Sequence, residues 1–245
     1  MLQIYRYEEV TSTNDVAKTL AREGEREVVI IARSQSAGRG RMGRSFESPA
    51  GLGLYVSVLW RPLCSAEDLL PLTAMAAAAA AMAIESVVGG EVGIKWPNDL
   101  VLNGKKIAGL LTESALASDG TVDFVVLGLG LNVHHKASDF SPEVAAIASS
   151  LEAEVGCTVD DGALEQAVAE ALLQTLRHLC APETYLDEYR CRCVTVGKTC
   201  RLLPGEETAE AIDIDGRYGL VVEREGKRET VRSGEVSVRG LYGYV

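Results

Sequence analysis

Residues 92–133, VGIKWPNDLVLNGKKIAGLLTESALASDGTVDFVVLGLGLNV, carry the pattern that decides the fold. Short apolar runs in this stretch, each bounded by polar residues or glycine, are typical of β-strands. The Asn103-Gly104 pair between two of them is a strong signal for a tight hairpin. Strands joined by such short turns pair in the antiparallel direction. We therefore predict four consecutive strands, at residues 92–95, 100–102, 106–113 and 122–131.

Helix and strand signals alternate on the N-terminal side of this stretch. Thr11–Asn14 offers several helix caps, and apolar residues then recur at helical spacing as far as Gly24. We predict strands at residues 28–32 and 52–60 and a long, alanine-rich helix at residues 66–88. Residues 34–51 are rich in glycine and serine, which predicts a long mobile loop of the kind that often carries function.

The C-terminal side begins with helices and ends in strands. Asp160-Asp161 caps a helix predicted to reach Leu179, and a shorter helix is predicted at residues 182–190. The character changes near residue 192, after which short strands separated by turn residues are predicted at 194–203, 208–214, 219–224, 227–232 and 235–239. Such a series is typical of a small barrel. We therefore predict two domains, residues 1–192 and 193–245.

Composition disfavours several classes of protein. The chain has 245 residues, 47% hydrophobic, which allows a large domain with a small one attached. Its most apolar segment, Ala74–Val88, is mostly alanine, so we predict a packed helix and no membrane partner. The net charge of −11 disfavours a nucleic-acid partner. The N-terminus resembles no secretory signal and the six cysteines are scattered, so we expect a cytoplasmic protein.

A basic island interrupts this acidic chain. Four arginines and no acidic residue lie between Arg33 and Arg44, within the run SAGRGRMGR at residues 36–44. Glycines let backbone N–H groups approach a ligand, and arginine contacts phosphate or carboxylate in a planar, bidentate manner. We interpret the run as an anion clamp, although taken alone a solvated basic loop explains it equally well.

Three further motifs lie in the central stretch. In Lys95–Asp99, KWPND, the tryptophan offers an apolar wall and the last two residues offer hydrogen bonds or a metal carboxylate. In Lys105–Glu113, KKIAGLLTE, a lysine at the mouth of an apolar strand can meet an anion. Gly128–Val133, GLGLNV, exposes backbone groups at a strand end but lacks the third glycine of a dinucleotide fingerprint. Each motif alone is equally typical of an ordinary turn or strand end.

The order and spacing of these motifs, preceded by Ser12-Thr13-Asn14, resemble the biotin–protein ligases. The resemblance covers residues 5–135 in detail, and the C-terminal segment is similar to that family's SH3-like barrel. It implies an α+β fold, with a mixed, mainly antiparallel sheet and helices on one face, like the class II synthetases, followed by the barrel. It also implies that biotin and ATP form biotinyl-5′-AMP and pyrophosphate. The biotinyl group then passes to one lysine of a biotin carboxyl carrier protein domain of a carboxylase.

The resemblance implies roles for particular residues. Those at the ureido end of biotin are Ser12, Thr13, Asn14 and Gln35. Others implied to bind biotin or its adenylate are Gly38, Arg39, Gly40, Arg41, Lys106, Gly109, Gly128 and Gly130. Those implied to bind the nucleotide are Arg41, Arg44, Phe46, Trp96, Asn98 and Asn132, and Asp99 would bind Mg²⁺. Because a carboxylate and a phosphate repel each other, the catalytic charges would be Arg39, Arg41 and Lys106.

Departures from the family pattern qualify these expectations. Phe46 stands where many bacterial members carry tryptophan, which leaves a smaller stacking face, and Met42 replaces a frequent arginine. Many relatives carry an N-terminal helix-turn-helix domain that represses biotin genes. The motifs here begin within the first dozen residues, so we expect a form without that domain and without a repressor role. Relatives also dimerise by pairing sheet edges, so a homodimer is a further expectation.

Other interpretations remain open at this point. A lipoate or octanoate ligase would share the general fold, and a non-catalytic biotin-binding module would share the biotin pocket. Cys191, Cys193 and Cys200 lack the paired spacing of zinc sites, so we expect core or surface thiols. His134-His135 follows the glycine strand and is expected in a solvated loop.

Overall fold

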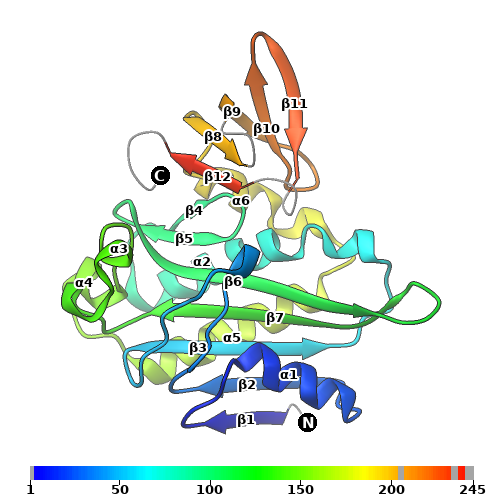
Figure 1. Cartoon of the computed structure of the whole chain (residues 1–245), viewed down its shortest axis with the longest axis vertical. Coiled ribbons are helices and arrows are strands. Elements are labelled where there is room, and N and C mark those ends of the chain that lie inside the picture. Colours follow the sequence, from blue (N-terminus) through cyan, green and yellow to red (C-terminus); the bar gives the residue numbers. More distant parts are fainter. Residues whose placement is uncertain (1–2, 204–206, 233–236, 241–245) are drawn as a thin grey trace.

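The computed structural model describes residues 3–203, 207–232 and 237–240. A seven-stranded sheet of order β1-β2-β3-β7-β6-β5-β4 forms the centre of the molecule, and a five-stranded sheet of order β11-β10-β9-β8-β12 lies at one end (Figure 1). The central strands are β1 (Gln3–Tyr7), β2 (Glu27–Ala32), β3 (Gly53–Trp60), β4 (Gly93–Lys95), β5 (Asp99–Leu102), β6 (Lys105–Leu116) and β7 (Val122–Asn132). The others are β8 (Thr199–Leu203), β9 (Glu207–Ile214), β10 (Leu220–Arg224), β11 (Lys227–Val231) and β12 (Ser237–Gly240).

Residues 92–133 form the four strands that were predicted. β4, β5, β6 and β7 pair in sequence, each antiparallel to the next. Asn103 and Gly104 make the turn between β5 and β6 with φ of 49° and 78°, the left-handed region that asparagine and glycine tolerate best. β1 and β2 form the one parallel pair among the described strands. The sheet is therefore mixed and mainly antiparallel, as predicted.

Helices cover the central sheet unequally. The helices are α1 (Thr13–Arg22), α2 (Leu72–Val88), α3 (Pro142–Ala145), α4 (Leu151–Val155), α5 (Asp161–Arg177) and α6 (Leu186–Arg192). The two long helices, α2 and α5, pack on the face that presents Val29 and Val56, as expected. Among the described helices, α1 packs on the opposite face, against Val28, Ile30 and Leu59, which departs from the prediction of helices on one face. The alternation of β2 and β3 side chains explains this, because both faces of each strand are apolar.

The alanine-rich segment lies in the core. By length and composition residues 66–88 are the one helical stretch in the described part of the chain that could cross a membrane, and 61% of its apolar window is buried inside the protein. Residues 76–81 of α2 are all buried, because small side chains let α2 approach the sheet and α5 closely. The segment opens as a 3₁₀ turn at Ala66–Leu69, and α2 follows Pro71.

Four elements differ from the sequence prediction. β1 was missed because it is a half-exposed edge strand without a clear apolar alternation. α3 and α4 lie where only a loop was expected. The first strand of the C-terminal sheet begins at Thr199 instead of residue 194, because Val194 and Thr195 bind the backbone of residues 94–96. Strands β9, β10 and β11 lie within two residues of their predicted bounds, whereas the start of the predicted strand 235–239 falls outside the described residues.

Candidate active site

Two adjoining cavities open on the sheet near the Gly/Arg loop. The large cavity, of about 480 Å³, lies among that loop, residues 95–99, β6 and residues 140–148. The small cleft lies beside the start of α1 and the glycines of β7. Arg39, Phe46 and Gly109 line both. Each predicted site residue lines one of the two cavities, apart from Gly38, at which an added Cβ would lie 2.3 Å from the Phe46 carbonyl oxygen.

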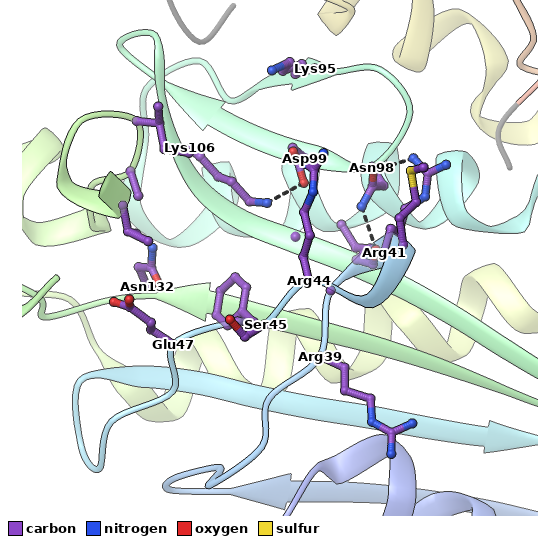
Figure 2. Close-up of a pocket in the computed structure, with 18 of the residues that line it drawn as sticks. Arg39, Arg41, Arg44, Ser45, Glu47, Lys95, Asn98, Asp99, Lys106 and Asn132 are labelled. Carbon is purple, nitrogen blue, oxygen red and sulfur yellow. Dashed lines mark hydrogen bonds and ion pairs between the residues drawn. The ribbon is translucent and has the colours of Figure 1, made fainter. Parts of the chain in front are cut away.

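The Gly/Arg loop folds into a small closed turn. The Phe46 N–H donates to the Gly38 carbonyl at 2.9 Å, and the Gly40 N–H donates to the Arg44 carbonyl at 2.7 Å. Met42 and Gly43 at the tip have φ of 56° and 73°, which lets the chain reverse. This geometry places Arg41 and Arg44 near Asn98 and Asp99 at the large cavity, whereas the Arg39 side chain points toward α1 (Figure 2).

Positive charge dominates the large cavity. Its lining includes five cationic side chains, Arg39, Arg41, Arg44, Lys95 and Lys106, and two carboxylates, Glu47 and Asp99. Lys106 Nζ lies 2.7 Å from Asp99 Oδ1. Such an excess of cations in a protein of net charge −11 suits a polyanionic ligand. Lys95 lies within the KWPND motif but was not among the predicted site residues, because its burial beside the cavity depends on the fold.

Arg41 and Asn98 meet across the large cavity. An Arg41 Nη1–H donates to Asn98 Oδ1 at 3.1 Å, while Asn98 Nδ2–H donates to the Leu110 carbonyl at 2.8 Å. Burial lowers the pKa of Arg41 below its usual value, and the nearby Asp99 offsets only part of this effect. The guanidinium nevertheless stays protonated, as it does in proteins generally. The loop is thus joined to the KWPND segment by a side-chain hydrogen bond.

An apolar wall closes another side of the large cavity and was missed by the sequence analysis. Phe140, Val144, Ile147 and Ala148 form it. The Lys106 N–H donates to the Ile147 carbonyl at 2.9 Å, so the wall is attached to β6. The spacing of Phe140, Val144 and Ile147 is helical, and Ser141-Pro142 is a helix start, so the signal was present in the sequence.

Trp96 is held mainly by the C-terminal part of the chain. Its side chain lines the large cavity but is only 2% exposed, and the indole N–H donates to the Tyr218 carbonyl at 2.9 Å. The Trp96 backbone N–H donates to the Thr195 hydroxyl at 3.0 Å, and the Tyr189 hydroxyl donates to the Pro97 carbonyl at 3.0 Å. The segment that leads to Asn98 and Asp99 is therefore fixed by residues beyond position 188.

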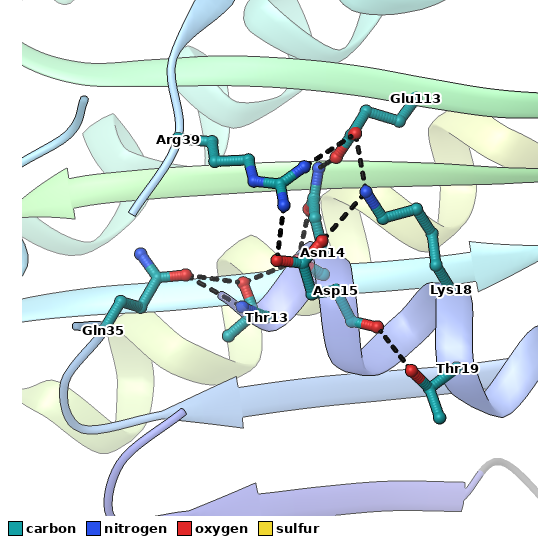
Figure 3. Close-up of polar contacts among 9 residues, drawn as sticks. Thr13, Asn14, Asp15, Lys18, Thr19, Gln35, Arg39 and Glu113 are labelled. Atoms are coloured by element: carbon teal, nitrogen blue, oxygen red, sulfur yellow. Dashed lines mark hydrogen bonds and ion pairs between the residues drawn. The ribbon is translucent and has the colours of Figure 1, made fainter. Parts of the chain in front are cut away.

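The small cleft is lined by polar side chains whose partners are set by the fold (Figure 3). The Thr13 N–H donates to Gln35 Oε1 at 2.9 Å, and Asn14 Nδ2–H donates to Glu113 Oε2 at 2.8 Å. Arg39 Nη2 lies 2.7 Å from Asp15 Oδ2, so Arg39 forms an ion pair with α1. Asp15, Ser57 and Glu113 were not among the predicted site residues, although each contacts a residue that was. Lys18, also not predicted, pairs with Asp15 and Glu113.

Glycine is required sterically at two positions of β7. A Cβ on Gly128 would lie 2.2 Å from Asn14 Oδ1, and a Cβ on Gly130 would lie 2.7 Å from the Phe46 ring. Phe46 therefore packs on Gly130 where the two cavities meet. Its predicted stacking on a nucleotide base stays a prediction.

The two histidines after β7 have different environments. His134 lies between Glu152 and Asp161, with ring nitrogens 3.0 Å and 2.8 Å from their carboxylate oxygens. The expectation of a solvated loop is wrong for His135, which is 2% exposed and stacks on Phe140 at 4.7 Å between ring centroids. The apolar wall that the sequence analysis missed is what buries it. Cys193 and Cys200 are buried thiols, and Cys191 is exposed.

Comparisons with known proteins agree on one family. The sequence model of the biotin/lipoate A/B protein ligase family matches residues 6–132. The bifunctional ligase/repressor BirA of Bacillus spizizenii is 32% identical over 94% of this chain and 72% of its own length. The biotin–acetyl-CoA-carboxylase ligase of Paracoccus denitrificans is 31% identical over 94% of this chain and 98% of its own length.

Solved structures show the same relationship. The biotin protein ligase of Aquifex aeolicus, in complex with biotin and ATP, is 25% identical with a TM-score of 0.82 and covers 97% of this chain and 99% of its own. That of Leishmania major, in complex with biotinyl-5-AMP, is 27% identical with a TM-score of 0.62 and covers 94% of this chain and 99% of its own. The predicted fold class, including the separate C-terminal sheet, is confirmed.

Proposed function

Because this chain belongs to the biotin/lipoate A/B protein ligase family, we infer that its two cavities bind biotin and ATP. The protein is a biotin–protein ligase, which forms biotinyl-5′-AMP and transfers the biotinyl group to a lysine of a carrier protein. The observation that supports this best is the meeting of the small polar cleft and the cationic cavity at Arg39. Biotinyl-5′-AMP has the matching form, with a polar uncharged head, an acyl phosphate at its centre and a nucleotide at the other end.

The small cleft is the proposed site of the biotin head. Ser12, Thr13, Asn14 and Gln35 offer the hydrogen bonds that a ureido group needs. The acyl chain would run along β7, beside Leu111 and Leu129, which also line the cleft. The carboxylate would then reach Arg39 and Gly109, where the cleft meets the large cavity.

The large cavity is the proposed site of ATP. Arg41, Arg44, Lys95 and Lys106 would contact the phosphates, and Asn98 and Asn132 would add hydrogen bonds. The wall of Phe140, Val144 and Ile147 supplies the apolar surface that a purine needs. Phe46 would close the side of the nucleotide nearest to biotin.

The chemistry follows from this placement. A biotin carboxylate oxygen attacks the α-phosphorus of ATP, the bond to the β-phosphate bridging oxygen breaks, and pyrophosphate leaves. Arg39, Arg41 and Lys106 would stabilise the negative charge that builds up as two anions approach. The carrier lysine then attacks the acyl carbon and AMP leaves, so no nucleophilic side chain of this protein is needed. The Gly/Arg loop would exclude water from the reactive anhydride.

Magnesium would bind here chiefly through ATP. No group of three or more histidine, cysteine or carboxylate side chains that could hold a metal is found in the described residues. Mg²⁺ often needs only one or two protein carboxylates beside phosphates and water, and Asp99 at the large cavity fits that demand. Bound there, Mg²⁺ would neutralise phosphate charge.

Further parts of the proposal concern the whole protein. We propose domains at residues 1–192 and 193–245 and a carboxylase carrier domain as the protein substrate. The charge of −11 supports the absence of a nucleic-acid partner and of a repressor role. Six free cysteines support the cytoplasm, and the burial of residues 66–88 supports the absence of a membrane partner. The edge strand β1 of the central sheet would allow a homodimer.

A pyrophosphate-release assay with three acids tests this function. With ATP and Mg²⁺, the protein should release pyrophosphate in the presence of biotin and not with lipoate or octanoate. A preference for lipoate or octanoate would identify the alternative ligase. Biotin binding without pyrophosphate release would identify a binding module.

A further inference from the structure

A chain of hydrogen-bonding groups lies beneath the small cleft and links β6, α1 and β3 (Figure 3). Asn14 Nδ2 is 2.8 Å from Glu113 Oε2, and Asn14 Oδ1 is 2.6 Å from the Ser57 hydroxyl. Ser57 Oγ is in turn 2.7 Å from Thr13 Oγ1. Ser57 is completely buried, so water cannot supply alternative partners there. We call Glu113, Asn14, Ser57 and Thr13 the cleft relay.

Glu113 fixes the orientation of the Asn14 amide. Its Oε1 lies 2.7 Å from Lys18 Nζ and 3.6 Å from Arg39 Nη1, so two cations stabilise the ionised carboxylate. An ionised carboxylate can only accept hydrogen bonds. The NH₂ end of Asn14 must therefore face Glu113, and its oxygen must face Ser57.

The direction of the remaining bonds follows by counting protons. Asn14 Oδ1 can only accept, so the single Ser57 hydroxyl proton is donated to it. Ser57 Oγ then accepts the Thr13 hydroxyl proton at 2.7 Å. The competing acceptor for that proton, Gln35 Oε1, is farther away at 3.2 Å and already accepts the Thr13 backbone N–H at 2.9 Å.

The result is a cleft whose two central oxygens are acceptors. The hydroxyl proton of Thr13 is used within the relay, and Asn14 Oδ1 lies beside Gly128, which also lines the cleft. Both oxygens retain lone pairs and neither can offer a proton. They suit a ligand head that donates N–H groups, as a cyclic urea does and a dithiolane ring does not.

We propose that Glu113 is a positioning residue that sets the specificity of the small cleft for a ligand head bearing N–H groups. This inference rests on the proposed binding of biotin in the cleft. Glu113 itself need not touch biotin. Because the ionised carboxylate can only accept, every hydrogen bond in the relay has one donor and one acceptor assignment. A neutral amide of the same shape could donate as well as accept, so it would not fix that assignment.

The test replaces Glu113 by glutamine. Glu113→Gln keeps the size of the side chain but lets the Asn14 amide adopt either orientation, so the KM for biotin should rise roughly tenfold to hundredfold. The KM for ATP should change less than twofold. Discrimination against biotin methylated at one ureido nitrogen should weaken. Glu154→Gln is the matched control, because Glu154 accepts from the Asn103 amide at 3.0 Å on the surface, and it should change none of these values.

A second variant separates orientation from a general structural effect. Asn14→Asp places two carboxylates together and should impair biotin use severely. In the Asn14→Asp, Glu113→Gln double variant the glutamine can donate to the new carboxylate, which still accepts from Ser57, so part of the affinity should return.

Three results would count against the relay. The first is an unchanged biotin KM in folded Glu113→Gln, and the second is unchanged discrimination against the methylated analogue. The third is a biotin KM in the double variant that rises by the product of the two single-variant effects. If the wild-type protein releases no pyrophosphate with biotin, the proposed function fails instead.

Discussion

Gly128 shows how closely the small cleft is packed at the scale of single residues. Glu113 and Ser57 hold Asn14 from two sides, so an added methyl group at Gly128 cannot be accommodated by rotation of the Asn14 amide. We expect Gly128→Ala to raise the KM for biotin at least tenfold and to lower the free energy of unfolding by about 1–3 kcal/mol. Steady-state kinetics and urea unfolding measure the two effects.

Gly216→Ala provides the control for this experiment. No atom lies within 4 Å of the added Cβ at that position. The variant should keep wild-type kinetics, and an equal loss of biotin affinity in both variants would contradict the packing argument.

The charge of Lys106 is expected to be important for the formation of biotinyl-5′-AMP. Its ammonium group is paired with Asp99 at 2.7 Å, so Lys106→Met removes a cation and leaves a carboxylate near the phosphates. The kcat for pyrophosphate release should fall roughly 10²- to 10³-fold, since fixed charges contribute on that scale. Lys227→Met, an exposed lysine on β11, should retain full activity. A Lys106→Met enzyme with near-normal kcat would exclude Lys106 from catalysis.

The sequence allowed the motif residues to be predicted but not their partners. Ser57 lies 43 residues from Asn14 in the chain, and Glu113 lies 99 residues from it. Neither has a local signal, because Ser57 is one polar residue inside an apolar strand and Glu113 is one acid on a long strand. Contacts at such separations become visible only when the strand order is known.

At the scale of elements, α6 and the C-terminal sheet position one wall of the ATP cavity. Tyr189→Phe removes the hydroxyl that donates to the Pro97 carbonyl and leaves that buried carbonyl without a partner. We expect a loss of about 1–3 kcal/mol in the free energy of unfolding and a several-fold rise in the KM for ATP, with a smaller change for biotin. Chemical unfolding and a kinetic comparison of the two substrates measure this.

Tyr218→Phe separates the two effects of Tyr189. The Tyr218 hydroxyl donates to the Pro182 carbonyl, away from residues 95–99, while its backbone carbonyl still accepts from Trp96. Stability should fall in this variant with no change in the KM for ATP. If the KM for ATP rises equally in both variants, the selective role of Tyr189 is contradicted.

His134 joins the end of β7 to α4 and α5. Partial burial lowers its pKa, but hydrogen bonds to Glu152 and Asp161 outweigh this and raise the pKa above the usual 6.5. The folded state thus favours protonated His134, and its contribution to stability is complete below pH 6.5 and lost as the pH rises through the folded pKa. The difference in unfolding free energy between wild type and His134→Gln should therefore shrink above pH 6.5.

Asp161→Asn tests the cause of that pH dependence. The substitution removes one of the two carboxylates that stabilise the protonated ring. The pH-dependent part of the stability difference should become smaller in this background. A difference that grows with rising pH, or that is independent of pH, would contradict the assignment.

Elements with strong local signals were predictable and others were not. The Asn103-Gly104 pair predicted the turn between β5 and β6, and the run of alanines predicted α2. β1 has no apolar periodicity because it is an edge strand, and its parallel pairing with β2 depends on the α1 crossover. β8 begins later than predicted because Val194 and Thr195 bind residues 94–96 instead of continuing the strand. These tertiary contacts have no local signal in the sequence.

At the scale of the whole molecule, the site is assembled from segments that are distant in sequence. The Gly/Arg loop, the KWPND segment and residues 140–148 meet only because β6 and β7 bring them to one end of the sheet. The family resemblance predicted the architecture of the first two segments. It did not extend to the third, whose short helix α3 was taken for part of a loop.

Mass spectrometry of a carrier domain tests the central claim most directly. The protein would be incubated with biotin, ATP, Mg²⁺ and a biotin carboxyl carrier protein domain, and the carrier would be analysed by peptide mapping. The account predicts one added biotinyl group on a single carrier lysine, with loss of the product when ATP is omitted. A folded protein that binds biotin but leaves the carrier unmodified, or that attaches lipoate instead, would contradict the account.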